Sequence, residues 1–153
     1  MATINATLTV GSDIIDGLSI NKTMTLNKAD SQVGIELTSG LVRRCFSSTN
    51  QVDLITAGAQ NYGTPTASKS AKVYIKNVGS DSTKHFKIGK GTSSGSATAT
   101  AMVGNATTYW ELGRLYGGDW MLIPWDAAST TGDITIQPSS AEKMDVEFMV
   151  FFE

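Results

Sequence analysis

Hydrophobic and polar residues alternate along much of this chain with the period of two that is typical of β-strands. Residues 4–10 alternate isoleucine, alanine, leucine and valine with threonine and asparagine, and the run ends at Gly11-Ser12-Asp13. Residues 18–26 repeat the pattern with one exception, because Lys22 occupies an otherwise apolar position. Each segment therefore has one apolar face, which we expect to pack against a core, and one polar face.

Similar runs continue to the end of the chain, separated by clusters of turn-forming residues. Two segments lack this pattern: residues 57–70 are expected to form a long surface loop, and residues 89–96 a flexible loop. A bulge at Ser39-Gly40 is expected to interrupt one strand. The remaining runs are residues 33–37, 41–46, 52–55, 71–78, 85–88, 109–125 (cut at Gly117-Gly118-Asp119), 134–136 and 144–152.

The spacing of these runs indicates the fold class. Roughly eight to ten short strands, with turn signals every 8–12 residues, are typical of a β-sandwich or a barrel. No segment has the composition of a stable helix, and no repeat of fixed period is visible. The length of 153 residues suits one domain. We therefore expect a single all-β domain, an antiparallel β-sandwich spanning residues 1–153.

The last two strand segments are apolar at consecutive positions. In residues 120–125 and 148–152 one face is expected to enter the core, so the other needs a second apolar surface. A subunit interface is the preferred interpretation. The alternative, that both faces are buried inside one domain, stays open. The interface candidates are Trp120, Leu122, Trp125, Phe148, Val150 and Phe152.

Charge and cysteine content restrict the partners. The formal net charge of -2, with only 17% charged residues, argues against a nucleic-acid partner, which requires a concentrated basic surface. The first ten residues lack the features of a signal peptide, and no stretch approaches the roughly 20 apolar residues that cross a bilayer. Cys45 is the only cysteine, which excludes an intrachain disulfide and fits a reducing compartment. We expect a cytoplasmic site of synthesis and no membrane partner.

Few residues are suited to catalysis. A Ser-His-Asp arrangement would have to use His85, the sole histidine, which lies in an expected hairpin where exposure is ordinary. One histidine and one cysteine do not form a structural zinc site. The segment Gly89-Lys90-Gly91-Thr92 is not a phosphate-binding loop. Such a loop has a glycine, four further residues and then Gly-Lys-Ser/Thr; here Gly91 follows Lys90, and the required earlier position holds no glycine. We expect no catalytic residue, no metal and no cofactor.

A carbohydrate site is the main alternative. Three carboxylates lie among three tryptophans, a combination that serves glycoside chemistry or sugar binding. In the structural interpretation, which we favour, the tryptophans fill a core or an interface and the two aspartates belong to turns. The residues concerned are Trp110, Glu111, Asp119, Trp120, Trp125 and Asp126.

The C-terminal third resembles small structural proteins of tailed bacteriophages. The resemblance rests on Glu111–Trp125, Ile134–Ser139 and Val146–Phe152, with Val73–Asn77 upstream, and it covers roughly residues 71–153 at the level of pattern. It implies a jelly-roll β-sandwich without enzymatic activity. It further implies a capsid decoration (cement) protein, or another virion accessory protein of the neck or tail. The implied partners are copies of the chain itself, as a homotrimer, and the major capsid protein or other virion proteins. Assembly would take place in the bacterial cytoplasm, and the final location would be the virion.

Overall fold

The computed structural model describes residues 4–14, 19–26, 37–57, 70–91, 109–127 and 132–153. Within these ranges the chain forms eleven β-strands and no helix, so the all-β prediction is confirmed. None of the described segments is a helix with the length and hydropathy needed to span a bilayer. Residues 33–36 of the third expected run, and residues 58–69 and 92–96 of the two expected loops, lie outside the described ranges.

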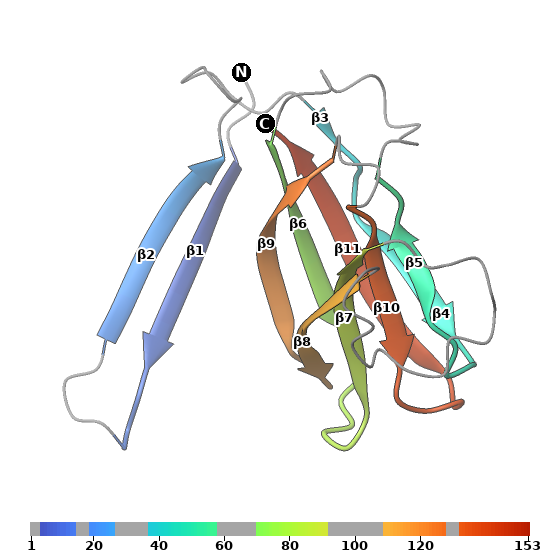
Figure 1. The fold of residues 1–153 in the computed structure, drawn as a ribbon. Helices are drawn as coiled ribbons and strands as arrows, with labels where there is room; N and C mark the ends of the chain where they lie inside the picture. Colours follow the sequence, from blue (N-terminus) through green and yellow to red (C-terminus); the bar gives the residue numbers. More distant parts are fainter. Residues whose placement is uncertain (1–3, 15–18, 27–36, 58–69, 92–108, 128–131) are drawn as a thin grey trace.

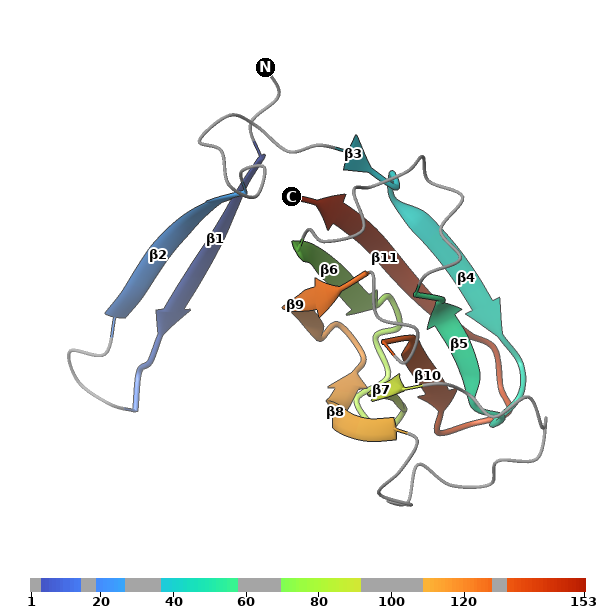
Figure 2. The ribbon, with the colours of Figure 1, turned by 45° about the horizontal axis from the view of Figure 1, so that its top comes forward.

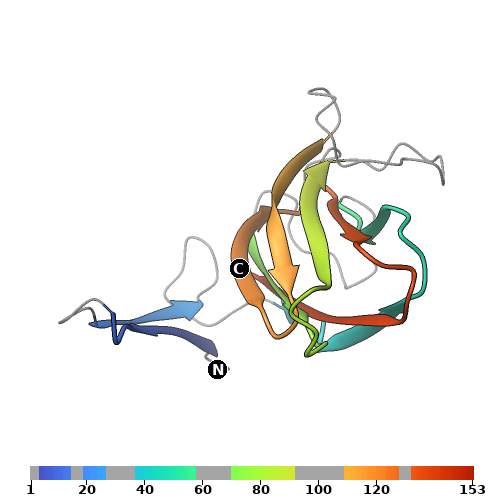
Figure 3. The same cartoon turned by 90° about the horizontal axis from the view of Figure 1, so that it is seen from below.

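The first two strands form a hairpin of their own. β1 (Ile4–Gly11) and β2 (Ser19–Leu26) pair antiparallel along their whole length and share no ladder with the other strands. Figures 1 and 3 show the hairpin standing to one side of the remaining strands. We expected the apolar face of residues 4–10 to pack in a core, but it lies outside the core cluster. Leu8 and Met24 are 46% and 41% exposed.

The other nine strands form a sandwich of two antiparallel sheets, as predicted (Figure 2). In one sheet β11 is central and pairs with β6 on one edge and with β3 and β4 on the other, while β9 pairs with β6. The order of the other sheet is β5-β10-β7-β8. The strands are β3 (Leu37–Thr38), β4 (Val42–Phe46), β5 (Val52–Ile55), β6 (Ser70–Asn77), β7 (His85–Gly91), β8 (Tyr109–Tyr116), β9 (Trp120–Asp126), β10 (Ile134–Pro138) and β11 (Met144–Phe152).

The strand pairs of the sandwich are nested around one point in the sequence. β7 pairs with β8, β6 with β9, β5 with β10 and β4 with β11, so the second half of the sandwich retraces the first. Two further pairings, β10 with β7 and β11 with β6, join these ribbons into sheets. The sandwich is therefore a long, folded ribbon, and its longest-range pairings are those of β11 with β4 and β3.

Two predicted strand boundaries, at Ser39-Gly40 and at residue 89, can be compared with the structure. Ser39-Gly40 separates β3 from β4 along the same edge of β11, as the bulge prediction required. Gly40 has a φ of 72°, which glycine adopts without a steric penalty, and the Val150 amide donates to Ser39 Oγ at 2.9 Å. By contrast, the prediction of a loop from residue 89 is wrong for residues 89–91. These residues are the end of β7 and pair with β8 and β10.

The core lies between the two sheets. The inward-facing residues of β11 and β10 pack with Phe86, whose ring meets that of Phe46 edge to face at 5.8 Å. Trp125 is also inside, and its indole N–H donates to the Gly132 carbonyl at 2.5 Å. The fully buried apolar side chains of this core are Ala71, Val73, Ile75, Phe86, Ile88, Ile136, Val146 and Val150.

Replacing Phe86 with alanine tests this core. Because the ring is fully buried, Phe86→Ala should lower the free energy of unfolding by about 3–5 kcal/mol. Leu41→Ala is the control, since Leu41 is 63% exposed and its loss should change stability by about 0.5 kcal/mol or less. Urea unfolding followed by tryptophan fluorescence measures both. Equal effects of the two substitutions would contradict the assignment of the core.

Candidate interaction surface

The outer face of the five-stranded sheet carries the exposed apolar residues of β9. Trp120 and Leu122 point away from the core, and Trp120 is 51% exposed. The other four interface candidates face the interior, each 3% exposed or less, and pack in the core, so they do not form part of an outer surface. They are Trp125, Phe148, Val150 and Phe152.

Residues from β6 and β11 extend this surface beyond the residues that the sequence singled out. Tyr74 is paired with Leu122 on one side and with Met149 on the other, so these three side chains form a row across three strands. The Tyr74 and Trp120 rings lie 6.4 Å apart. We call Tyr74, Trp120, Leu122, Pro124 and Met149 the outer patch. Asp145 and Glu147 precede Met149 on the same face of β11, and this alternation is the signal in the sequence that could have identified Met149 as an outward residue.

Charged groups of both signs border the outer patch. Lys76 lies between Trp120 and Glu147 in the next row of the sheet, and Glu147 is paired in turn with Arg43. The Tyr74 hydroxyl donates to Glu147 Oε1 at 3.1 Å. Burial, together with this hydrogen bond and the charge of Glu147, raises the pKa of Tyr74. The patch therefore presents a neutral phenol, with its polar atom directed toward a carboxylate at the rim.

On the other side, Lys72 forms an ion pair with Glu153. Lys72 lies opposite both Pro124 and Phe151, and Phe151 is buried but is not part of the core cluster. The rim therefore carries charges of both signs. Removing the apolar row between them from water would be favourable, whereas the rim charges can stay solvated.

The structure does not assemble the tryptophans into a carbohydrate site. Trp125 is buried, while Trp110, on β8 of the other sheet, is 70% exposed. Asp119 Oδ2 accepts a hydrogen bond from the Tyr116 amide at 2.9 Å, which is the turn role expected for it. Glu111 is paired with Arg114 at 3.3 Å. The described residues therefore do not bring the three tryptophans together with the carboxylates at one site.

His85 lies on the edge of the fold without a catalytic partner. Its backbone exchanges hydrogen bonds with Ser139, but its imidazole Nδ1 is buried and has no hydrogen-bond partner. The imidazole packs against Tyr116, with ring centroids 4.9 Å apart. The orienting carboxylate that a Ser-His-Asp arrangement requires is missing from this nitrogen.

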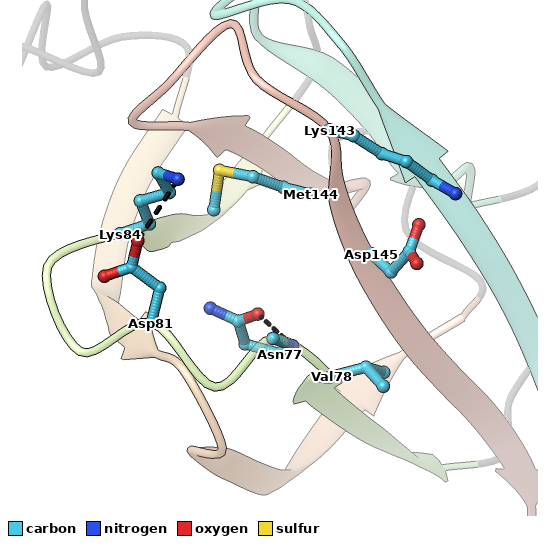
Figure 4. Close-up of a pocket in the computed structure, with 8 residues that line it drawn as sticks. Asn77, Val78, Asp81, Lys84, Lys143, Met144 and Asp145 are labelled. Atoms are coloured by element: carbon cyan, nitrogen blue, oxygen red, sulfur yellow. Dashed lines mark hydrogen bonds and ion pairs between the residues drawn. The ribbon is translucent and has the colours of Figure 1, made fainter.

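A hollow of about 210 Å³ lies where the turn after β6 meets the start of β11 (Figure 4). The side chains lining it include Asp81, Lys84, Lys143 and Asp145, whose charges cancel. Lys84 is paired with Asp81 at 3.1 Å, and hydrogen bonds from Thr83 with the contribution of Lys84 lower the pKa of Asp81 to about 2. The lining contains no histidine, cysteine or hydroxyl side chain.

Among the residues that the structure describes, no group of three or more His, Cys, Asp or Glu side chains is arranged to hold a metal ion. Comparisons of the chain with family models, with curated proteins and with solved structures found no match. The outer patch, an apolar row bordered by charged residues, is the candidate surface developed below.

The environment of His85 predicts a pH dependence of stability. Burial lowers its pKa from 6.5, with Arg114 and Lys87 acting in the same direction and Glu111 opposing them. As the pH falls through 6.5, the unfolded chain binds a proton before the folded chain does, so the free energy of unfolding should decrease. His85→Gln should reduce this decrease between about pH 7.5 and 5.5, measured as the urea midpoint at each pH. Identical pH profiles would show that His85 does not titrate differently on folding.

Proposed function

We propose that this chain is a non-enzymatic virion structural protein: a capsid decoration protein that assembles with copies of itself and stabilises the shell of a tailed bacteriophage. A homotrimer is the proposed assembly, with the major capsid protein as its partner in the shell. An accessory role at the neck or tail of the virion is the second interpretation of the same features. Two features support the proposal: residues 71–153 resemble small structural proteins of tailed bacteriophages, and the sandwich has the geometry described above.

The strand order supports a jelly roll as the finer description of the fold. A jelly roll consists of two packed four-stranded sheets built from a ribbon folded over itself. If β3 is counted with β4, the sheets here are β4-β11-β6-β9 and β5-β10-β7-β8, and every strand of β4–β7 pairs with one of β8–β11 in reverse order. A fold of this kind is common in viral shell proteins.

The outer patch is the observation that carries the proposal. In the outer patch, the half-exposed ring of Trp120 lies beside other apolar side chains. Covering such a surface with a second protein is favourable, because apolar area is removed from water. Tryptophan and tyrosine are enriched among the residues that dominate binding energy at interfaces. A self-associating shell component needs such a surface.

Assembly explains how a small protein would stabilise a shell. In a symmetric trimer each subunit presents the same contact to the surface beneath it. After the first contact forms, the second and third form at high effective concentration, so three weak contacts bind far more tightly than one. A trimer placed across neighbouring shell subunits would therefore resist their separation.

Trp120→Ala tests the role of the outer patch. If the patch lies at a subunit contact, the substitution should weaken the oligomer by about 30-fold, because a tryptophan at the centre of an interface contributes about 2 kcal/mol or more. Light scattering over a concentration series measures the effect. Trp110→Ala is the matched control, since it removes an exposed indole from the other sheet and should leave the oligomer unchanged. An unaltered oligomer in Trp120→Ala would rule out this patch.

The location of the protein tests the virion role separately. Gold-labelled antibodies against the purified chain should bind to the shell of particles produced by the phage that encodes it. Label confined to the neck or tail would replace decoration with the accessory role. Purified particles that contain neither label nor peptides of this chain would contradict both interpretations.

A further inference from the structure

The N-terminal hairpin has two chemically different faces. On one face the threonine and asparagine side chains hydrogen-bond across the strands, Thr7 with Thr23 at 3.0 Å and Thr25 to Asn5 at 2.9 Å. On the other face, the register brings apolar residues together in rows across the two strands. We call this second set the hairpin apolar face: Ile4, Ala6, Leu8, Val10, Ile20, Lys22, Met24 and Leu26.

Much of the hairpin apolar face is uncovered. Leu8, Ile20 and Met24 are between 39% and 46% exposed, whereas Leu26 at the end of β2 is buried. No residue of the hairpin belongs to the core cluster of the sandwich. An isolated two-stranded hairpin is at best marginally stable in water. A hairpin with eight residues in each strand and a continuous apolar face therefore indicates that another surface covers it.

We propose that the hairpin apolar face of one subunit packs on the outer patch of a neighbouring copy of the chain. This inference rests on the self-assembly proposed above and specifies which two surfaces meet. The contact is heterologous, since a hairpin meets a sandwich, so each subunit gives one hairpin and receives another. Repeated around an axis, such contacts close into a ring.

The two surfaces match in size and in character. Strands of eight residues are about 27 Å long, and two paired strands are about 10 Å wide. The strands that carry the outer patch have seven to nine residues, so a hairpin laid along them covers the patch and reaches the charged rows at Lys76 and Lys72 on either side of it. Stacked sheets pack about 10 Å apart, a spacing that suits side chains of the size of leucine, methionine and tyrosine.

Lys22 argues against the simplest alternative, in which two hairpins pack face to face. It lies opposite Leu8 in an inner row of the hairpin apolar face, so a hairpin pair would bury two ammonium groups without a carboxylate from either hairpin face. At the outer patch the ammonium group reaches a rim with both acidic and basic residues, including Glu147. The long aliphatic stem of Lys22 can lie over apolar side chains while its charge stays at that rim.

The area of the contact favours a closed ring over a simple pair. One hairpin would remove roughly 500 Å² from water when both partners are counted, from the dimensions given above. Stable interfaces bury about 1,200–2,000 Å², so a single contact falls short. In a closed trimer each subunit takes part in two such contacts, one with each neighbour, so a subunit leaves the ring only when both contacts break. Mutual exchange therefore explains how a small contact supports a stable assembly.

Disulfide trapping between two different chains tests the contact. In a Cys45→Ser background, which removes the exposed native thiol, one chain carries Leu8→Cys and the other Leu122→Cys. The two chains are distinguished by mass, refolded together and oxidised, and the products are counted by mass spectrometry. We expect the mixed disulfide dimer to predominate. Thr9→Cys, on the opposite face of the same strand, is the matched control and should give at least about tenfold less mixed product.

Each other outcome overturns the contact in a recognisable way. A homodimer of the Leu8→Cys chain would show that hairpins pair with each other. A separate variant carries Leu8→Cys and Leu122→Cys in the same chain. If this variant forms a disulfide within the chain while the two single variants give no mixed dimer, the hairpin folds back on its own sandwich. If the wild-type chain is oligomeric but no disulfide forms, the hairpin contact fails while self-assembly stands. A wild-type chain that stays monomeric removes self-assembly itself, and antibody labelling of virions then decides the shell role independently.

Discussion

The pairing of β11 with its neighbours holds the sandwich together. Its inner side chains are buried along the whole strand, and its two edges are paired with β6 and with β3 and β4. The partners of Phe148 illustrate the distance involved, since Val42 and Ile75 are far apart in the sequence. Closing such long loops costs conformational entropy, which burial of the inner face has to offset. Without β11 the outer patch would also lose the row that joins Leu122, Tyr74 and Met149.

The turns at one end of the ribbon fix its geometry. Asn77 is buried where β6 ends; its amide donates to the Leu115 carbonyl in the other sheet at 3.1 Å and its oxygen accepts from Gly79 at 3.0 Å. Gly117 lies so close to Asp81 that a Cβ atom would come within 2.7 Å of the backbone. The turn after β6 and the turn after β8 therefore pack directly on each other. This close packing holds the ends of the two sheets in register and sets the position from which β9 and Trp120 begin.

The sequence predicts the strands better than it predicts what they face. Alternation located the paired strands of the hairpin, and Gly117-Gly118-Asp119 located the turn between β8 and β9. Residues 148–152 are apolar at every position, so this run alone does not say which face Phe152 and Met149 occupy. The upstream Asp145 and Glu147, in phase with Met149, carry that information, and the register with β6 agrees with it. Likewise, the alternation of residues 4–10 shows that one face avoids water. It does not show whether the cover is the sandwich of the same chain or another molecule.

The edges of the sandwich indicate why assembly would proceed through faces. A free edge strand is a template for uncontrolled pairing unless it is short, bulged or carries proline. β3, β4 and β5 have two, five and four residues, and the pairing of β8 with β7 shifts register at Ile88–Gly89. On β9, the Asn77 amide donates to the Asp119 carbonyl, and the alternation of an antiparallel ladder then turns the nitrogen of Pro124 toward the free edge. Addition of strands at these edges is therefore disfavoured. Association through exposed apolar faces such as the outer patch remains open, and there side-chain shape and charge, and not backbone pairing, would select the partner.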